Sequence, residues 1–205
     1  MKKIALVFTA ILMGSIISGC KTKKIERIDP TQQTDLSGRW NDTDSRLVSN
    51  EMISDCMSRP WRTEFTAVKG KKPMVIIGNI KNKTTEHIES ETFIKDIEKA
   101  YINSGLVGVV QAADARKELR EERNDQQTYS SEETKKKWGL EKGADFMLNG
   151  VITSIVDQYG KNKVVFYQID LELTDLQTNE KVWIGDKKIK KAYHVVTIIL
   201  TELIQ

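Results

Sequence analysis

Apolar and polar residues repeat with two different periods along this chain. In several segments between residues 45 and 124, apolar residues recur at every third or fourth position, which is the spacing of amphipathic helices. From Phe146 onward, apolar and polar residues alternate one by one, as they do in strands with one buried and one exposed face. The pattern therefore predicts helices mainly in the first half and an antiparallel sheet in the second.

The first helix is predicted over residues 45–57. Val48, Met52 and Cys56 recur every four residues on one face, and Pro60 follows. Proline ends a helix because it cannot donate the next backbone hydrogen bond. We expect Cys56 to be a small buried residue rather than a catalytic thiol, since a reactive thiol needs a lowered pKa and a nearby base.

A parallel β-α-β unit is predicted next. Residues 74–80 form a short run rich in β-branched residues, which is typical of a buried strand. Residues 91–104 have an apolar face within about 120° of arc, and Gly105 supplies the left-handed residue that ends many helices. Residues 106–110 read as a second strand, so the unit should be a right-handed crossover between parallel strands.

Two further helices are expected between this unit and Phe146. A strongly charged helix is predicted over residues 112–124. A short helix is predicted from about Ser130 to Gly139 or Gly143, because Ser130 and Glu133 have the spacing of a capping box.

Three alternating segments, 146–158, 165–173 and 182–189, predict an antiparallel meander. The expected fold class is therefore α/β, a mixed sheet of about five strands with three or four helices, in which the parallel β-α-β unit precedes the meander. The apolar tail Ala192–Gln205 follows a basic segment and is too short to span a bilayer. An additional strand is the preferred interpretation of this tail, and its role stays open.

The first twenty residues indicate export and lipid attachment. Two lysines precede an apolar stretch, Ile4–Ile17, that is too short to cross a hydrocarbon core of about 30 Å. The sequence Ile17-Ser18-Gly19-Cys20 resembles a bacterial lipobox, in which the thiol of Cys20 accepts a diacylglyceryl group. An ordinary secretory signal with a chance cysteine is the alternative.

This processing would divide the chain into three parts. Residues 1–19 are the expected signal peptide, 20–44 the lipidated cysteine and a flexible tether, and 45–205 a single globular domain. Several acyl chains on one cysteine make release from a membrane negligible. In proteobacteria, an aspartate directly after the lipidated cysteine holds a lipoprotein in the inner membrane. Here that residue is Lys21, so the expected location is the outer membrane, with the domain facing the periplasm.

The composition argues against several functional classes. The 32 basic and 29 acidic residues give a net charge of only +3, whereas a nucleic-acid-binding domain carries a larger and more segregated basic excess. Two cysteines cannot form a disulfide scaffold, and two histidines leave little for a histidine-rich metal site. The chain has no HExxH, GxSxG, CxxC or Walker-type glycine motif. Any two carboxylates could meet in space, but no pattern selects a pair, so we expect no enzyme activity, no metal and no cofactor.

Candidate partner-binding residues lie on and just beyond the charged helix predicted over residues 112–124. Three arginines recur there at i, i+4 and i+7, within about 60° of one another, and two glutamines follow. Arginine forks suit carboxylate recognition, and arginine is enriched in binding hot spots. The alternatives are a solvated helix with pairs such as Lys117–Glu121, or arginines that tie the helix to the sheet edge. The candidate residues are Arg116, Arg120, Arg123, Gln126 and Gln127.

Short features that agree with a known family are spread from Ser45 to Lys191, over nearly the whole mature domain. They are Ser45–Ser49, Val75–Thr84, Phe93–Glu98, Ser104–Gly105, Arg116–Gln126, Gly143–Gly150, Asp175–Leu176 and Val182–Trp183. Together they resemble the penicillin-binding-protein activator family of bacterial lipoproteins, the LpoB type. The resemblance implies a domain similar to the N-terminal domain of TolB.

The resemblance also implies a function. It points to an outer-membrane lipoprotein that binds a bifunctional, class A penicillin-binding protein and activates peptidoglycan synthesis without catalysing a reaction itself. The expected partners are this synthase and, through the N-terminal lipid anchor, the membrane, but not nucleic acid. The alternative is a non-enzymatic subunit of an envelope assembly or secretion machine, because curli-secretion lipoproteins resemble the same fold class.

Overall fold

A computed structural model of the chain describes residues 25–134 and 139–193. The expected signal peptide, Cys20 and the tail beyond Tyr193 lie outside these residues. The described residues form two units, 25–32 and a larger unit that begins at Gln33. In the smaller unit, the backbone N–H and the hydroxyl of Thr31 both donate to Asp29 Oδ1 at 2.7 Å.

The larger unit is built on one mixed sheet of five strands in the order β2-β1-β3-β4-β5. Strand β1, second in this order, runs parallel to β2 and β3, and the pairs β3–β4 and β4–β5 are antiparallel. This arrangement confirms the predicted α/β fold with a parallel unit followed by a meander. The strands are β1 (Met74–Asn82), β2 (Gly108–Val110), β3 (Phe146–Tyr159), β4 (Asn162–Asp175) and β5 (Lys181–Tyr193).

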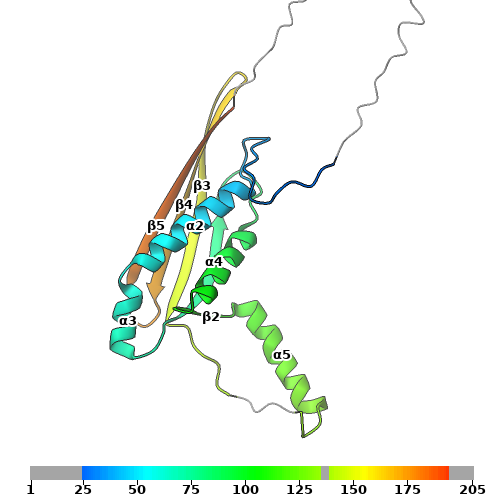
Figure 1. Ribbon diagram of the computed structural model, residues 1–205, viewed down its shortest axis with the longest axis vertical. Coiled ribbons are helices and arrows are strands. Elements are labelled where there is room, and N and C mark those ends of the chain that lie inside the picture. The colour runs from blue at the N-terminus through cyan, green and yellow to red at the C-terminus, as the bar shows by residue number, and fades with distance from the viewer. Residues whose placement is uncertain (1–24, 135–138, 194–205) are drawn as a thin grey trace, which may run out of the picture. The chain divides into compact units, whose positions relative to one another are not determined.

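Two of the helices in the described part of the chain cover one face of this sheet. Figure 1 shows α2 and α4 side by side across the strands. Helix α2 packs against β5 and α4, and α4 packs against β1 and β2. The four described helices are α2 (Asp42–Ser58), α3 (Trp61–Lys69), α4 (Ser90–Ser104) and α5 (Ala113–Tyr129).

The core lies between the sheet and these two helices, and the alternation in β4 explains why. Every second residue from Val165 to Leu173 is buried, because side chains of a strand point in turn to opposite faces. From the helices, Val48 and Met52 of α2 and Ile97 of α4 enter the same core. The core therefore uses one face of the sheet.

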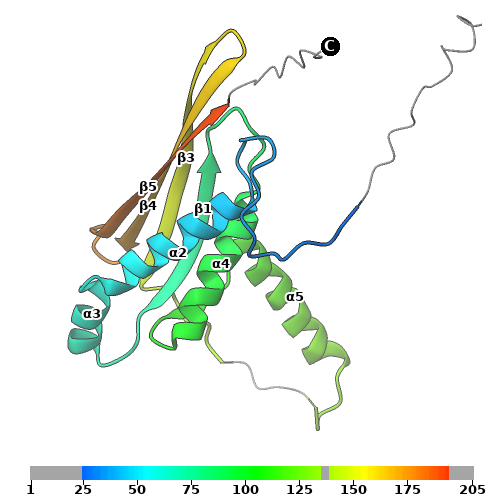
Figure 2. The same ribbon diagram turned by 45° about the horizontal axis from the view of Figure 1, so that its top comes forward.

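The β3–β4 hairpin projects beyond the helices (Figure 2). Its turn has two residues, because Tyr159 pairs with Asn162, and Gly160 adopts a φ of 58° that glycine tolerates without strain. Ile155 and Tyr159 are mainly exposed at this end. The strands of the meander are longer than predicted, and Ala192 and Tyr193 of the apolar tail belong to β5.

Helix α3 was not expected from the sequence. It begins directly after Pro60 and ends at Gly70, which has a φ of 65°. Trp61 and Phe65, one turn apart, make edge-to-face contacts with Phe146, with ring centroids 5.2 and 5.3 Å away. Such ring pairs stabilise beyond their buried area, so tertiary packing rather than a long periodic pattern accounts for this short helix.

The prediction of a helix that begins at Ser130 is wrong for the residues that the structure describes. Helix α5 continues to Tyr129, and the backbone N–H of Ser130 donates to Gln126 O at 3.1 Å, so Ser130 closes α5 instead of starting a new helix. Residues 131–134 form a turn and 139–144 have no helix. Residues 135–138 lie outside the described part.

The folded body starts earlier than residue 45. Helix α2 begins at Asp42, where Asn41 and Asp44 form a capping box: Asp44 N–H donates to Asn41 Oδ1 at 3.1 Å, and Asn41 N–H donates to Asp44 Oδ2 at 3.0 Å. We call the segment Gln33–Asn41 the strap. It belongs to the larger unit, which begins at Gln33.

A lysine near the end of β5 holds the strap. Lys191 Nζ lies 2.7 Å from Asp35 Oδ1 and 2.5 Å from Asp44 Oδ2, and it also donates to the carbonyl oxygen of Arg39 at 3.1 Å. The side chains of Lys191 and Asp44 are only 12% and 6% exposed. Because these charges are largely removed from water, each depends on its partners for solvation.

Trp40 joins the strap to the core. Its backbone N–H donates to Glu86 Oε2 at 3.1 Å and its indole N–H donates to Ser45 Oγ at 2.8 Å. Its ring meets that of Tyr167 edge to face, with centroids 5.5 Å apart. The strap therefore has both polar and apolar attachments to the body.

Gly38 explains how the strap passes the end of β5. Its φ of 61° lies in the left-handed region, and a Cβ at this position would come within 2.8 Å of the Tyr193 ring. A glycine is therefore required both by the backbone and by the space available.

The cluster around Lys191 shifts two pKa values in opposite directions. Burial alone would lower the pKa of Lys191, but hydrogen bonds to Asp35 and Asp44 outweigh burial and raise it above its usual value. Hydrogen bonds from Lys191 and Asn41 lower the pKa of Asp35 below its usual 3.8. The Asp35 contribution to stability is therefore present above pH 3.8 and is lost as the pH falls through the lowered pKa.

We expect Lys191→Ala to lower the free energy of unfolding by about 1–3 kcal/mol, because it leaves the buried Asp44 without its cation. The neighbouring Lys190 is exposed, so the matched control Lys190→Ala should change it by less than about 0.5 kcal/mol. Urea unfolding at pH 7 measures both. The difference between wild type and Lys191→Ala should shrink below pH 3.8; equal stability of the two variants at pH 7 would show that the cluster is not structural.

Candidate functional site

Helix α5 is the one described helix that buries none of its residues. It begins directly after β2, which ends at Val110, and its sequence is mostly charged and polar. Its apolar side chain Leu119 is 43% exposed. A helix of this kind contributes little to the core, so its surface is free to serve another purpose.

Three residues of α5 face the sheet edge across a shallow groove. The groove has a volume of about 210 Å³. We call it the arginine groove. Its walls are Met74 of β1, Val109 and Val110 of β2, and Arg116, Leu119 and Arg123 of α5. Helical spacing of three and four residues places these α5 side chains on one face.

The loop before β3 supplies the remaining wall through Glu141 and Lys142. Arg120 binds the Glu141 carboxylate with both arms: Nε donates to Oε1 and Nη2 to Oε2, each at 2.8 Å. Arg123 Nη1 lies 3.6 Å from Oε1 of the same carboxylate. This two-armed geometry is the one in which a guanidinium recognises a carboxylate most specifically.

The three arginines act on one carboxylate. The hydrogen bond from Arg120 is the main cause that lowers the pKa of Glu141, and the charges of Arg120, Arg116 and Arg123 lower it further. The same pair raises the pKa of Arg120. The site therefore holds an ionised carboxylate at neutral pH.

The structure also contains both arrangements that the sequence left open for this helix. Arg116 Nη2 donates to the carbonyl oxygen of Gln111 at 3.0 Å, next to the end of β2, so one arginine does tie the helix to the sheet edge. Lys117 lies 3.9 Å from Glu121 as an exposed pair along the helix.

The two candidate glutamines do not join the arginines. Gln126 Nε2 donates to Glu122 Oε1 at 2.8 Å along α5, and neither Gln126 nor Gln127 lines the arginine groove. Sequence reasoning missed the other walls: Glu141 lies 21 residues beyond Arg120 in the chain, and Met74 and Val109 are strand residues that only the fold brings near α5.

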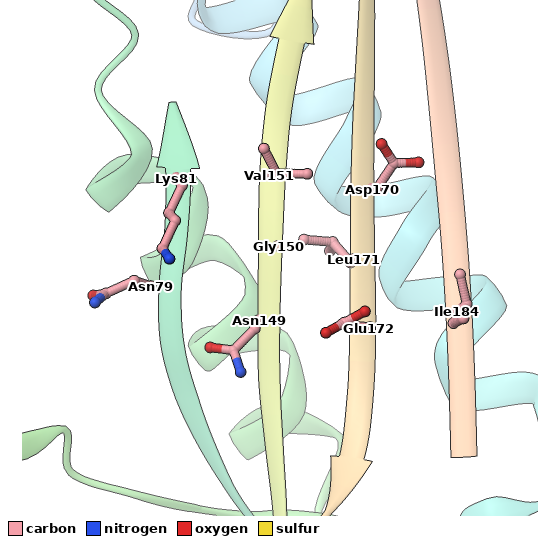
Figure 3. A pocket seen from close by; sticks show the side chains of 9 residues that line it. All are labelled: Asn79, Lys81, Asn149, Gly150, Val151, Asp170, Leu171, Glu172 and Ile184. Atoms are coloured by element: carbon pink, nitrogen blue, oxygen red, sulfur yellow. The ribbon is translucent and has the colours of Figure 1, made fainter. Parts of the chain in front are cut away.

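A second hollow lies on the face of the sheet away from α2 and α4. Figure 3 shows side chains of β1, β3, β4 and β5 on this open face, with the helices behind the strands. Its volume is about 460 Å³, and Lys81, Asp170 and Glu172 contribute opposite charges to its lining. Glu172 is also paired with Lys181 at 2.5 Å. This face therefore offers no single sign of charge to a partner.

Cys56 is buried, as predicted. It is 1% exposed, and the hydroxyl of Tyr101 donates to its sulfur at 3.1 Å. Burial is the main cause that raises the pKa of the thiol to about 12, so the nucleophilic thiolate is scarce at neutral pH.

The histidines and acids give no indication of a metal centre. Within residues 25–134 and 139–193, no three His, Cys, Asp or Glu side chains are grouped as metal ligands would be. His87 is exposed, 3.9 Å from Glu89, and His194 lies outside the described residues. Among the helices that the structure describes, none is long and apolar enough to cross a membrane.

Comparison with family models gives a match over most of the chain. A family model described as peptidoglycan-synthase activator LpoB matches residues 44–189, from the first turn of α2 to β5. The comparison with curated proteins found no significant match.

Several solved structures are similar at low sequence identity. The NMR structure of Escherichia coli LpoB is 12% identical, with 86% of this chain and 85% of that one covered and a TM-score of 0.39. The LpoB C-terminal domain from Salmonella enterica is 14% identical, with 63% and 93% covered and a TM-score of 0.34. Lipoprotein GNA1162 from Neisseria meningitidis is 12% identical, with 58% and 83% covered and a TM-score of 0.37.

Proposed function

The chain belongs to the peptidoglycan-synthase activator LpoB family, and from this premise we propose that it is an outer-membrane lipoprotein, anchored through Cys20, that binds and activates a bifunctional, class A penicillin-binding protein. The observation that carries the proposal is the extent of the family match. Residues 44–189 include all four described helices and all five strands, apart from the first two residues of α2 and the last four of β5. A role in regulating peptidoglycan synthesis follows from membership of this family.

Activation by a protein of this kind is allosteric. A regulator that takes no part in the reaction raises its rate only by binding the more active state of the synthase more tightly than the less active one. A tenfold shift of that equilibrium requires a binding preference of about 1.4 kcal/mol. One or two well-placed side chains are enough to supply a preference of this size.

The arginine groove is the surface we assign to the synthase. It combines the half-buried Arg116 and the exposed Arg123 with the exposed Leu119 and a floor of β-strand residues. Arginine together with partly desolvated apolar surface is the usual composition of an interface hot spot. The open face of the sheet lacks this combination, because no arginine lines its hollow.

The strap limits how far the body can stand from its anchor. If Cys20 is acylated and Gln33 is already part of the body, the connection comprises residues 20–32. At about 3.3–3.6 Å per residue its greatest length is about 45 Å. The body therefore starts within about 45 Å of the anchoring membrane, and its own size adds to the distance at which the arginine groove can meet the synthase.

The first test measures binding and activation with the full-length chain in detergent, because a fragment starting at Ser45 would lose the strap and the helix cap. We expect the class A synthase of the same cell to be retained on the immobilised protein and its polymerisation of lipid II to be faster. Arg120→Glu should weaken binding at least about tenfold. It should leave the melting temperature within about 2 °C of the wild-type value, because the side chain is exposed.

The matched control for this test is Lys117→Glu. It makes the same change of charge on the same helix, at an exposed residue that pairs with Glu121 along the helix, whereas Arg120 pairs with Glu141 of the groove, so binding should be nearly unchanged. Retention of no synthase and an unaltered polymerisation rate with the wild-type protein would refute the proposed function. Equal effects of the two substitutions on binding would show that the arginine groove is not the surface that binds the synthase.

The second test concerns the anchor. Cells grown with labelled palmitate should incorporate the label into the wild-type protein, which should fractionate with the outer membrane. Cys20→Ser should abolish labelling, since no other acceptor thiol is expected in the lipobox, while Cys56→Ser should not affect it. A water-soluble, unlabelled wild-type protein would contradict the lipid anchor.

A further inference from the structure

The chain places one of its own acidic side chains in the arginine groove. Glu141 lies in the segment 139–144, which is neither helix nor strand, and its carboxylate joins this segment to α5 through Arg120. Directly after this segment, Asp145 is held against β1, because its backbone N–H donates to Met74 O at 2.7 Å. Glu141 therefore links the segment that precedes β3 to Arg120 of α5.

The groove has more positive charge than Glu141 neutralises. Arg116, Arg123 and Lys142 line it together with this carboxylate, and Arg120 binds the carboxylate from the helix. A second or replacement carboxylate would therefore still meet an excess of positive charge at short range.

The apolar floor of the groove is not occupied by the segment that carries Glu141. Leu140, directly before the acid, is fully exposed, so it adds no apolar contact to Met74, Val109 or Leu119. The volume of about 210 Å³ is below the roughly 300 Å³ at which small-molecule pockets begin. It suits one or two side chains of a peptide better than a metabolite.

The bond between Glu141 and Arg120 is suited to exchange. The side chains of Arg120 and Glu141 are 57% and 31% exposed, and ion pairs that remain in water contribute little net stability. A partner segment that offered a carboxylate and also filled the apolar floor would gain contacts that Glu141 does not make.

We propose that Glu141 is a built-in competitor, and that the groove binds an acidic peptide segment in which a carboxylate lies close to an apolar side chain. The inference rests on the proposed function, since it names the chemistry by which the same site recognises the synthase. Binding of the partner replaces the carboxylate of Glu141 on Arg120 and places an apolar side chain against Leu119. Before the partner binds, Glu141 holds the arginine side chains in the positions in which they can bind a carboxylate.

The test uses two short fluorescent peptides that differ only in one residue. The first contains a leucine and a glutamate separated by one residue, and the second has glutamine in place of the glutamate. Fluorescence anisotropy measures their binding to the full-length protein in detergent. We expect the glutamate peptide to bind at least about tenfold more tightly than the glutamine peptide.

Glu141→Gln should tighten binding of the glutamate peptide about two- to fivefold, because it removes the competitor. The control Glu121→Gln makes the same change of charge next to Lys117, at a residue that does not line the groove, and should leave the affinity almost unchanged. Equal affinities of the two peptides, no binding of either, or equal effects of the two substitutions would each overturn the proposal.

The peptide test is independent of the synthase test. Selective binding of the glutamate peptide without activation of the synthase would keep the carboxylate site and refute the proposed function. Activation of the synthase without peptide selectivity would keep the proposed function and move its binding surface elsewhere.

Discussion

The structure depends on the burial of one face of a five-stranded sheet under α2 and α4. The alternation is complete in β4 and is also present in the first half of β3 and, with half-buried residues, in β5. It fixes the register of the strands, because a slip by one residue would expose the apolar set. Helices α2 and α4, with Trp61 and Phe65 of α3 against Phe146, cover this face. Helix α5, at the β2 edge, is therefore not needed for the core, and its arginines are available for recognition.

Two groups of charges show how burial separates a structural role from a functional one. Lys191, Asp35 and Asp44 lie where the strap meets the body, and the low exposure of Lys191 and Asp44 makes the loss of either partner costly to stability. Arg120 and Glu141 are paired with better geometry but remain accessible to water. The second pair can open at little cost, which is what a site that exchanges one carboxylate for another requires.

The sequence predicted those parts of the fold whose information is local. The long alternating strands, α2, α4 with its terminal Gly105, and the arginine face of α5 all follow from periodicity within one segment. Helix α3 was missed because Trp61 and Phe65 are organised by Phe146, a residue far along the chain. Ser130 was misread because the same residue type can begin or end a helix. The strap and Glu141 depend on contacts between distant segments, which no local pattern contains.

The central claim is that this body presents the arginine groove to a peptidoglycan synthase, and hydrogen–deuterium exchange tests it most directly. Exchange would be measured on the full-length protein alone and with the class A synthase. We expect slower exchange in the complex for residues 113–129 and 139–145, with little change in the strap and β5. Protection confined to the strap, β5 or the open face of the sheet, with α5 unaffected, would contradict it.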